Sequence, residues 1–173
     1  MKQGSRGLIQ VYTGDGKGKT TAALGLAIRA AGRDLLVIMI QFLKGEESGE
    51  HLFLSRQKQI EILQLNTDNC FQQSTAELQQ IVEKTWSCSR EKVMGGEYDV
   101  VILDEVFVAI SREMLLIADV LDLMRQKPDH VELVLTGRNA SPEIVREADL
   151  VTEMLMIKHP HTEGIGQRIG IEL

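Results

Sequence analysis

The chain has 173 residues and a formal net charge of −6. This length suits one domain with a substantial core, and residues 1–173 are predicted to form a single domain. The acidic balance argues against general nucleic-acid binding, which uses a basic face. No apolar run approaches the roughly 20 residues that span a bilayer, and the first residues lack the apolar core of a signal peptide. A cytoplasmic location without membrane attachment is therefore expected.

A glycine-rich loop follows the first predicted strand. Residues 8–12 are apolar and β-rich, residues 13–21 read Thr-Gly-Asp-Gly-Lys-Gly-Lys-Thr-Thr, and residues 22–32 have a helical pattern that ends on a glycine. A strand, a glycine-rich turn with Gly-Lys-Thr and a helix are the context of a phosphate-binding loop. Glycine residues let successive main-chain N–H groups turn toward an anion, and the helix adds the positive end of its dipole.

The spacing of this loop is shorter than usual. In the pattern Gly-x-x-x-x-Gly-Lys-Thr the first glycine would stand where this chain has Thr13. The nearest glycine is Gly14, and the loop contains the additional Lys17. Lys19 is expected to reach phosphate oxygens and Thr20 to present its hydroxyl to a divalent cation. A surface glycine turn with two incidental lysine residues is the alternative, but it leaves the flanking strand and helix unexplained.

The next predicted elements alternate between strands and helices. Residues 35–40 are a nearly continuous apolar run, which predicts a strand buried on both faces of a parallel sheet. The polar loop over 41–50 then lies at the carboxyl end of the sheet, where ligands of open α/β sheets bind. A helix over 51–59, an edge strand over 60–65 and a capped helix over about 75–94 follow.

Two adjacent acids follow the next apolar strand. Residues 98–103 lead directly to Asp104 and Glu105. In P-loop proteins an acid at this place holds the Mg²⁺ that accompanies the phosphates. Alternation along a strand would direct the two side chains to opposite sides, so only one would face the metal, and the pattern does not choose between them. Two solvated loop carboxylates are the alternative.

The segment after these acids is predicted to serve packing. Residues 106–110 indicate a short helical turn, and Ser111 is expected to cap a helix that ends before Pro128. The two cysteines of the chain, Cys70 and Cys88, have no partner at metal-ligand spacing, so both are expected to be free thiols.

The remaining pattern completes an α/β architecture. A fifth strand over 131–137 leads to Arg138, which is placed either to meet a phosphate or to lie in solvent. Ser141 begins a short helix, and residues 150–157 predict a sixth strand. We therefore predict a three-layer P-loop NTPase-like (RecA-like) domain with a mainly parallel sheet of about six strands.

With these motifs in place, the chain resembles the ATP:corrinoid adenosyltransferases of the P-loop type, which make adenosylcobalamin. The resemblance covers most of the chain in order, and the shortened loop is itself a feature of that family. The matching stretches are residues 13–23, 41–45, 101–105, 135–138, 148–154 and 157–160.

The resemblance implies an unusual use of the loop. ATP is held in a reversed sense, its ribose C5′ is attacked by cob(I)alamin, and the whole triphosphate leaves. The protein then positions the reactants and neutralises the leaving group. Lys19, Thr20 and Glu105 are the expected catalytic residues, and Thr20 and Glu105, with Asp104 close by, would hold Mg²⁺ or Mn²⁺. The expected ATP contacts are Gly14, Asp15, Gly16, Lys17, Gly18, Lys19, Thr20, Thr21 and Arg138.

The resemblance also implies partners. ATP and a reduced corrinoid are the substrates, a flavoprotein-type reductant is a candidate electron donor, and a homodimer is a candidate assembly. One departure concerns an aromatic-rich segment of the family, which is not recognisable at residues 69–72. A non-catalytic nucleotide- or corrinoid-binding paralogue is therefore one alternative. A small NTPase or kinase, suggested by the loop with Asp104 and Glu105, is the other.

Overall fold

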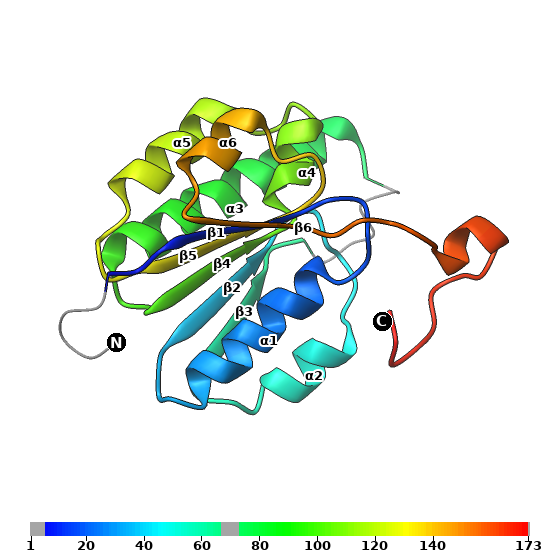
Figure 1. The fold of residues 1–173 in the computed structure, drawn as a ribbon, viewed down its shortest axis with the longest axis horizontal. Helices are drawn as coiled ribbons and strands as arrows, with labels where there is room; N and C mark the ends of the chain where they lie inside the picture. Colours follow the sequence, from blue (N-terminus) through cyan, green and yellow to red (C-terminus); the bar gives the residue numbers. More distant parts are fainter. Residues whose placement is uncertain (1–5, 67–72, 173) are drawn as a thin grey trace.

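The computed structural model describes residues 6–66 and 73–172, and its centre is a six-stranded sheet (Figure 1). The strands run across the sheet in the order β3-β2-β4-β5-β1-β6, and every neighbouring pair is parallel. The prediction of a mainly parallel sheet of about six strands is confirmed. The strands are β1 (Ile9–Thr13), β2 (Val37–Gln41), β3 (Ile60–Gln64), β4 (Val100–Asp104), β5 (Glu132–Thr136) and β6 (Leu150–Glu153).

Helices cover both faces of the sheet, as Figure 1 shows. One face carries α1 (Lys19–Ala31) and α2 (Gly49–Leu54). The other carries α3 (Thr75–Gly95), α4 (Val106–Ser111), α5 (Ile117–Gln126) and α6 (Pro142–Glu147), and a short 3₁₀ turn, η1 (Pro160–Glu163), lies in the C-terminal tail. This arrangement confirms the three-layer α/β fold.

The alternation of side chains along each strand supplies one hydrophobic core to each layer. In β2, Ile38 and Ile40 belong to the core beneath α3–α6, whereas Val37 and Met39 belong to the core beneath α1. Every residue of β2 is buried, as the continuous apolar run predicts for a central parallel strand. Helices therefore pack against both faces of the sheet through apolar side chains. The carboxyl ends of the strands lie outside these two cores, so the carboxyl edge can carry polar residues.

Several local predictions are confirmed. Ser74 and Glu77 form the capping box at the start of α3. Gly96 ends the same helix in a left-handed conformation, which glycine adopts without a steric penalty. Cys88 is a free thiol, as predicted. The aromatic-poor segment 69–72, with Cys70, lies outside the described residues.

Two helix predictions are wrong. Ser111 does not cap a helix: it is the last residue of α4, and Leu116 is the N-cap of α5. The apolar residues from Val106 onward are drawn into the core, so they form a complete helix before the chain turns at Glu113, whose φ is 60°. The helix predicted over 51–59 begins and ends earlier, as α2, because the polar residues after Leu54 have no apolar face to bury.

The predicted sixth strand is also shorter than 150–157. β6 ends at Glu153, where its partner β1 ends, and the chain beyond it follows the glycine-rich loop instead of a strand. The carboxyl ends of the parallel strands lie at one edge of the sheet, so this edge gathers the loops after β1, β2, β4 and β5. In the described part of the chain, none of the helices combines the length and apolar character needed to cross a bilayer.

Candidate functional site

The glycine-rich loop after β1 is held against the chain that follows β6. Met154 N–H donates to Thr13 O at 2.8 Å, and Gly16 N–H donates to Met154 O at 2.7 Å. Gly14 has a φ of 97°, and a Cβ atom there would lie 2.4 Å from Met154 O. The shortened loop therefore follows a path that requires glycine, and the segment after β6 supplies one wall of that path.

A glycine comparison tests this packing. Gly14→Ala is expected to lower the free energy of unfolding by about 1–3 kcal/mol, because alanine disfavours the positive φ and its Cβ meets main-chain oxygen. Gly25→Ala is the matched control, since Gly25 lies within α1 and a Cβ atom added there would meet nothing within 4 Å. The control should be more stable than the natural protein by roughly 0.5–1 kcal/mol. Equal denaturation midpoints for both variants would contradict the tight packing of the loop.

Lys19 closes the loop from the start of α1. Its Nζ donates to Gly14 O at 2.7 Å and to Gly16 O at 2.8 Å, and the side chain is buried. Burial lowers the pKa of Lys19, and the nearby Glu105 carboxylate offsets part of this effect. The main-chain N–H groups of the first turn of α1 have no acceptor within the helix. An ammonium and a helix N-terminus thus converge at one end of the loop, which is the arrangement that binds phosphate.

Thr20 is bonded to Asp104 at the carboxyl end of β4. Thr20 Oγ1 donates to Asp104 Oδ1 at 2.9 Å, and Thr136 Oγ1, from the end of β5, donates to the same oxygen at 2.7 Å. Gln41 Nε2, from the end of β2, donates to Asp104 Oδ2 at 3.1 Å. Asp104 is 1% exposed and accepts three side-chain hydrogen bonds, so burial of its carboxylate is compensated. The residue in contact with Thr20 is therefore Asp104, not Glu105.

Glu105 occupies a strained turn beside this cluster. Its φ is 59°, in the left-handed region that residues with a Cβ rarely adopt, and its N–H donates to Thr136 Oγ1 at 2.9 Å. Burial raises the pKa of Glu105, and the Asp104 carboxylate adds to the rise, while Lys19, Arg138 and Lys44 oppose it. Backbone strain and a buried carboxylate beside a second carboxylate both cost stability, which is typical of functional positions.

Replacing Glu105 with glutamine tests this cost. In the folded protein Glu105 binds its proton more tightly than in the unfolded chain, so its contribution to stability falls as the pH rises through its folded pKa. Glu105→Gln is therefore expected to raise the free energy of unfolding at neutral pH by roughly 0.5–2 kcal/mol. Urea denaturation should show a smaller gain near the usual glutamate pKa of 4.5. A loss of stability at neutral pH would refute this assignment.

Three other predicted residues lie at the rim of the loop. Arg138 Nη1 lies 3.4 Å from Asp15 Oδ1, and both side chains are more than half exposed. Lys17 Nζ donates to Glu172 Oε1 at 2.8 Å, so this lysine contacts the C-terminal tail. Hydrogen bonds from Arg168 and Lys17 hold the pKa of Glu172 well below its usual value. The structure thus brings Lys19, Thr20 and the two acids together, and it places Asp15, Lys17 and Arg138 around them.

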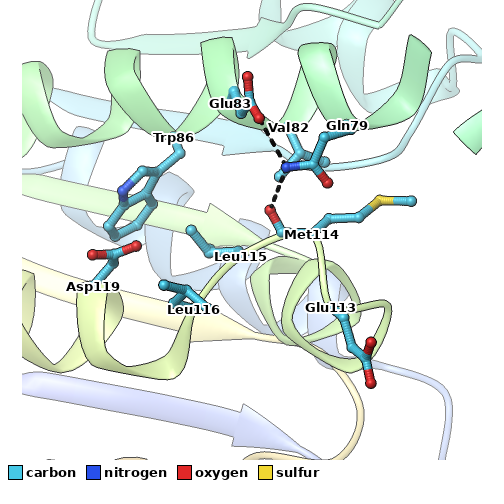
Figure 2. A pocket seen from close by; sticks show the side chains of 9 residues that line it. All are labelled: Gln79, Val82, Glu83, Trp86, Glu113, Met114, Leu115, Leu116 and Asp119. Carbon is cyan, nitrogen blue, oxygen red and sulfur yellow. Dashed lines mark hydrogen bonds between the residues drawn. The ribbon is translucent and has the colours of Figure 1, made fainter. Parts of the chain in front are cut away.

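A cavity of about 960 Å³ opens beside the loop. Residues 15–21 and Arg138 form one side, and Lys44, Glu50 and the tail from Met156 to Glu172 contribute the others. A smaller cavity of about 280 Å³ lies between α3 and the turn that precedes α5, in the other helical layer (Figure 2). Gln79 spans it by donating to Glu83 and to Met114 O. Neither the glycine-rich loop nor Asp104 or Glu105 lines this smaller cavity.

Sequence reasoning missed several residues of the site. Gln41 and Thr136 are polar residues at the ends of buried strands, a signal that could have identified both. His51 and Lys44 carried no such signal, because their roles depend on how the loop after β2 folds back. The tail residues that line the main cavity were not predicted as site residues.

These contacts place the chain among the P-loop nucleotide-binding proteins. Comparison with known families narrows the class: the family described as ATP:corrinoid adenosyltransferase BtuR/CobO/CobP matches residues 5–173. The chain belongs to this family, and the resemblance noted from its motifs is confirmed.

Individual relatives agree with the assignment. A corrinoid adenosyltransferase of Sinorhizobium sp is 34% identical over 176 residues, which cover 99% of this chain and 82% of the relative. A corrinoid adenosyltransferase of Pseudomonas aeruginosa is 33% identical, covering 96% and 84% respectively. The corrinoid adenosyltransferase of Escherichia coli (strain K12) is 30% identical, covering 98% and 87%.

Proposed function

We propose that the protein transfers the 5′-deoxyadenosyl group of ATP to the Co(I) centre of a reduced corrinoid, in adenosylcobalamin formation. The observation that carries this proposal is the cluster of Lys19, Thr20 and Asp104 at the shortened loop, beside an open cavity of about 960 Å³. Ligand sites usually measure about 300–1,000 Å³, and the cavity lies near the upper end of this range.

The reaction exchanges one bond for another. The electron pair of Co(I) forms the cobalt–C5′ bond, the C5′–oxygen bond breaks, and triphosphate leaves with the electrons of that bond. No side chain has to act as nucleophile or general base. The protein contributes by orienting C5′ toward the corrinoid and by stabilising the charge that develops on the leaving oxygen. Lys19 and the loop amides suit that role, and Lys17 can join them when it exchanges Glu172 for phosphate.

The oxygen-rich cluster also suits a hard divalent cation. We propose that Thr20 and the two acids hold Mg²⁺ or Mn²⁺, with Asp104 nearer to the Thr20 hydroxyl than Glu105. The Thr20 hydroxyl donates its hydrogen to Asp104, so the lone pairs of Thr20 Oγ1 remain available to the metal. Across residues 6–66 and 73–172, no three His, Cys, Asp or Glu side chains converge on one point. The remaining ligands would thus be phosphate oxygens and water, as is usual for Mg²⁺.

The tail and the last strand support proposals about partners. Met156, Ile165 and Ile171 are apolar residues of the tail that line the cavity, and we assign this tail side to the corrinoid. All of β6 is exposed, and Ile157 and Ile169 are more than nine-tenths exposed. An exposed edge strand and exposed apolar side chains in the tail both favour contact with a second copy of the chain. A homodimer, a flavoprotein-type reductant and a cytoplasmic location complete the proposal, with residues 1–173 as one domain.

Product analysis tests the proposed function. The protein is incubated with ATP, Mg²⁺ and chemically reduced cobalamin, and the expected products are adenosylcobalamin, seen in its absorption spectrum, and intact triphosphate. Orthophosphate or ADP as the main product would instead identify an NTPase or kinase. Tight cobalamin binding without turnover would identify a non-catalytic paralogue.

A further inference from the structure

A chain of hydrogen bonds runs from Asp104, in the proposed metal site, to the loop after β2. Asp104 Oδ2 accepts from Gln41 Nε2 at 3.1 Å, and Gln41 Oε1 lies 2.7 Å from His51 Nε2. The other ring nitrogen, His51 Nδ1, lies 3.0 Å from Ser48 N and 3.0 Å from Ser48 Oγ. Gln41 is fully buried, and Ser48 is 3% exposed. The contacts therefore form a continuous path through the protein interior.

One main-chain amide determines the direction of every bond in this path. Ser48 N–H can only donate, so His51 Nδ1 must accept. The proton of a neutral ring then resides on Nε2, which donates to Gln41 Oε1. With its oxygen turned to the histidine, Gln41 must direct its amide nitrogen to Asp104. Asp104 receives a donor on each of its two oxygens and keeps the purely accepting character of a carboxylate.

The path from Asp104 through Gln41 and His51 to Ser48 is a hydrogen-bond relay, and reversing its direction would disrupt the contacts of Asp104. If Gln41 turned its oxygen toward Asp104, two acceptors would face each other in a buried site, where the cost is not relieved by water. His51 prevents this reversal because its Nε2–H has no other acceptor among the contacts of the path. The orientation of Asp104 toward Thr20 thus depends on a residue outside the cluster.

We propose that His51 is a positioning residue of the adenosyl-transfer site, which acts through Gln41 to hold Asp104 in its metal- and triphosphate-binding orientation. The proposal rests on the proposed function, because it assigns Asp104 and Thr20 to the cation that accompanies ATP. Among the described contacts, His51 itself touches neither the glycine-rich loop nor Asp104 and Glu105.

The far end of the relay joins the wall of the main cavity. Lys44 Nζ donates to Ser48 Oγ at 3.0 Å and to Glu50 Oε1 at 2.8 Å. Burial alone would raise the pKa of Glu50, but hydrogen bonds from Lys44 and Ser48 outweigh it and set the pKa at about 2. The Glu50 carboxylate is therefore ionised at neutral pH, where it forms an ion pair with Lys44. His51 therefore links the position of this cavity wall, through Ser48 and Gln41, to the orientation of the Asp104 side chain.

The variants His51→Leu and His51→Gln separate positioning from packing. Leucine removes the polar contacts with Ser48 and Gln41, whereas glutamine can accept from Ser48 N–H through its oxygen and donate to Gln41 through its nitrogen. His130→Leu is the matched control, because it removes an imidazole that bonds Gly96 O, and neither residue takes part in the contacts of the relay. The ring tautomer of His51 is read first, by nitrogen NMR of the natural protein without ligands.

Mn²⁺ binding in the presence of ATP is the second measurement, because it does not depend on turnover. His51→Leu is expected to weaken Mn²⁺ binding and to lower kcat/KM by about tenfold, and His51→Gln should recover most of both. The His130→Leu control should match the natural protein. A double variant of His51→Leu with Gln41→Leu should be no worse than Gln41→Leu alone, because both act on Asp104 through one path.

The outcomes distinguish the two proposals. A proton on His51 Nδ1, unchanged Mn²⁺ binding in His51→Leu, or additive losses in the double variant would each overturn the positioning role and leave the proposed function intact. A natural protein that binds no Mn²⁺ with ATP would overturn the metal assignment, and the positioning role would fall with it.

Discussion

Replacing Lys19 with alanine is expected to lower kcat/KM for adenosyl transfer by roughly 10²-fold or more. Lys19 Nζ bonds to Gly14 O and Gly16 O at the mouth of the loop, within reach of any anion that enters it. Its charge matters most when the C5′–oxygen bond breaks, because the leaving triphosphate then gains negative charge. The loss should therefore fall on kcat as well as on KM for ATP, as steady-state kinetics of adenosylcobalamin formation would show.

The stability of the same variant completes the test. Desolvation of Lys19 disfavours its charged form, and water can replace the ammonium at the two carbonyl groups, so the free energy of unfolding should change by no more than about 1 kcal/mol. Lys84→Ala, at an exposed position on α3, is the matched control and should retain full activity. Activity equal to that of the control would show that the phosphate site lies elsewhere.

Replacing Asp104 with asparagine is expected to lower both activity and stability. Asp104 accepts from Thr20, Thr136 and Gln41, and an amide in its place adds a donor that must face one of these three donors. Either the two hydroxyls reverse, or Gln41 turns and meets the Nε2–H of His51. We expect a loss of about 1–3 kcal/mol in the free energy of unfolding and of about 10²-fold or more in kcat/KM.

Two comparisons sharpen this prediction. Asp122→Asn changes an exposed acid of α5 and should leave both quantities unchanged. Glu105→Gln is expected to lower activity yet raise stability, so the two adjacent acids should have opposite effects on denaturation. An Asp104→Asn protein as stable and as active as the natural one would contradict the hydrogen-bonded cluster and its proposed metal role.

The sequence was sufficient for the fold because its strongest signals are local. Continuous apolar runs such as that of β2 predicted buried parallel strands, and the loop from Gly14 to Thr20 fixed the position of α1 after β1. Errors arose where tertiary contacts determine the point at which a helix or strand begins or ends. Ser111 has the chemistry of an N-cap, but packing of the preceding apolar residues extends a helix through it.

The candidate site was only partly predictable for a related reason. The pattern placed Asp104 and Glu105 at the right edge of the sheet, but period-2 alternation ends where Glu105 adopts a positive φ. The contact between Asp104 and Thr20 could therefore not be chosen from spacing. The sequence predicted a helix that includes His51, but no local pattern indicated its contact with Gln41, which lies ten residues earlier. Such contacts depend on the tertiary structure of the loop after β2, which no local sequence pattern predicts.

A crystal structure with ATP, Mg²⁺ and a corrinoid tests the central claim most directly. We expect the triphosphate to lie in the loop from Gly14 to Thr21, with Lys19 on its oxygens and the metal beside Thr20 and Asp104. The ribose C5′ should face the cavity between the loop and the C-terminal tail, where the corrinoid binds. Phosphates bound outside the loop, or a C5′ turned away from that cavity, would contradict this claim.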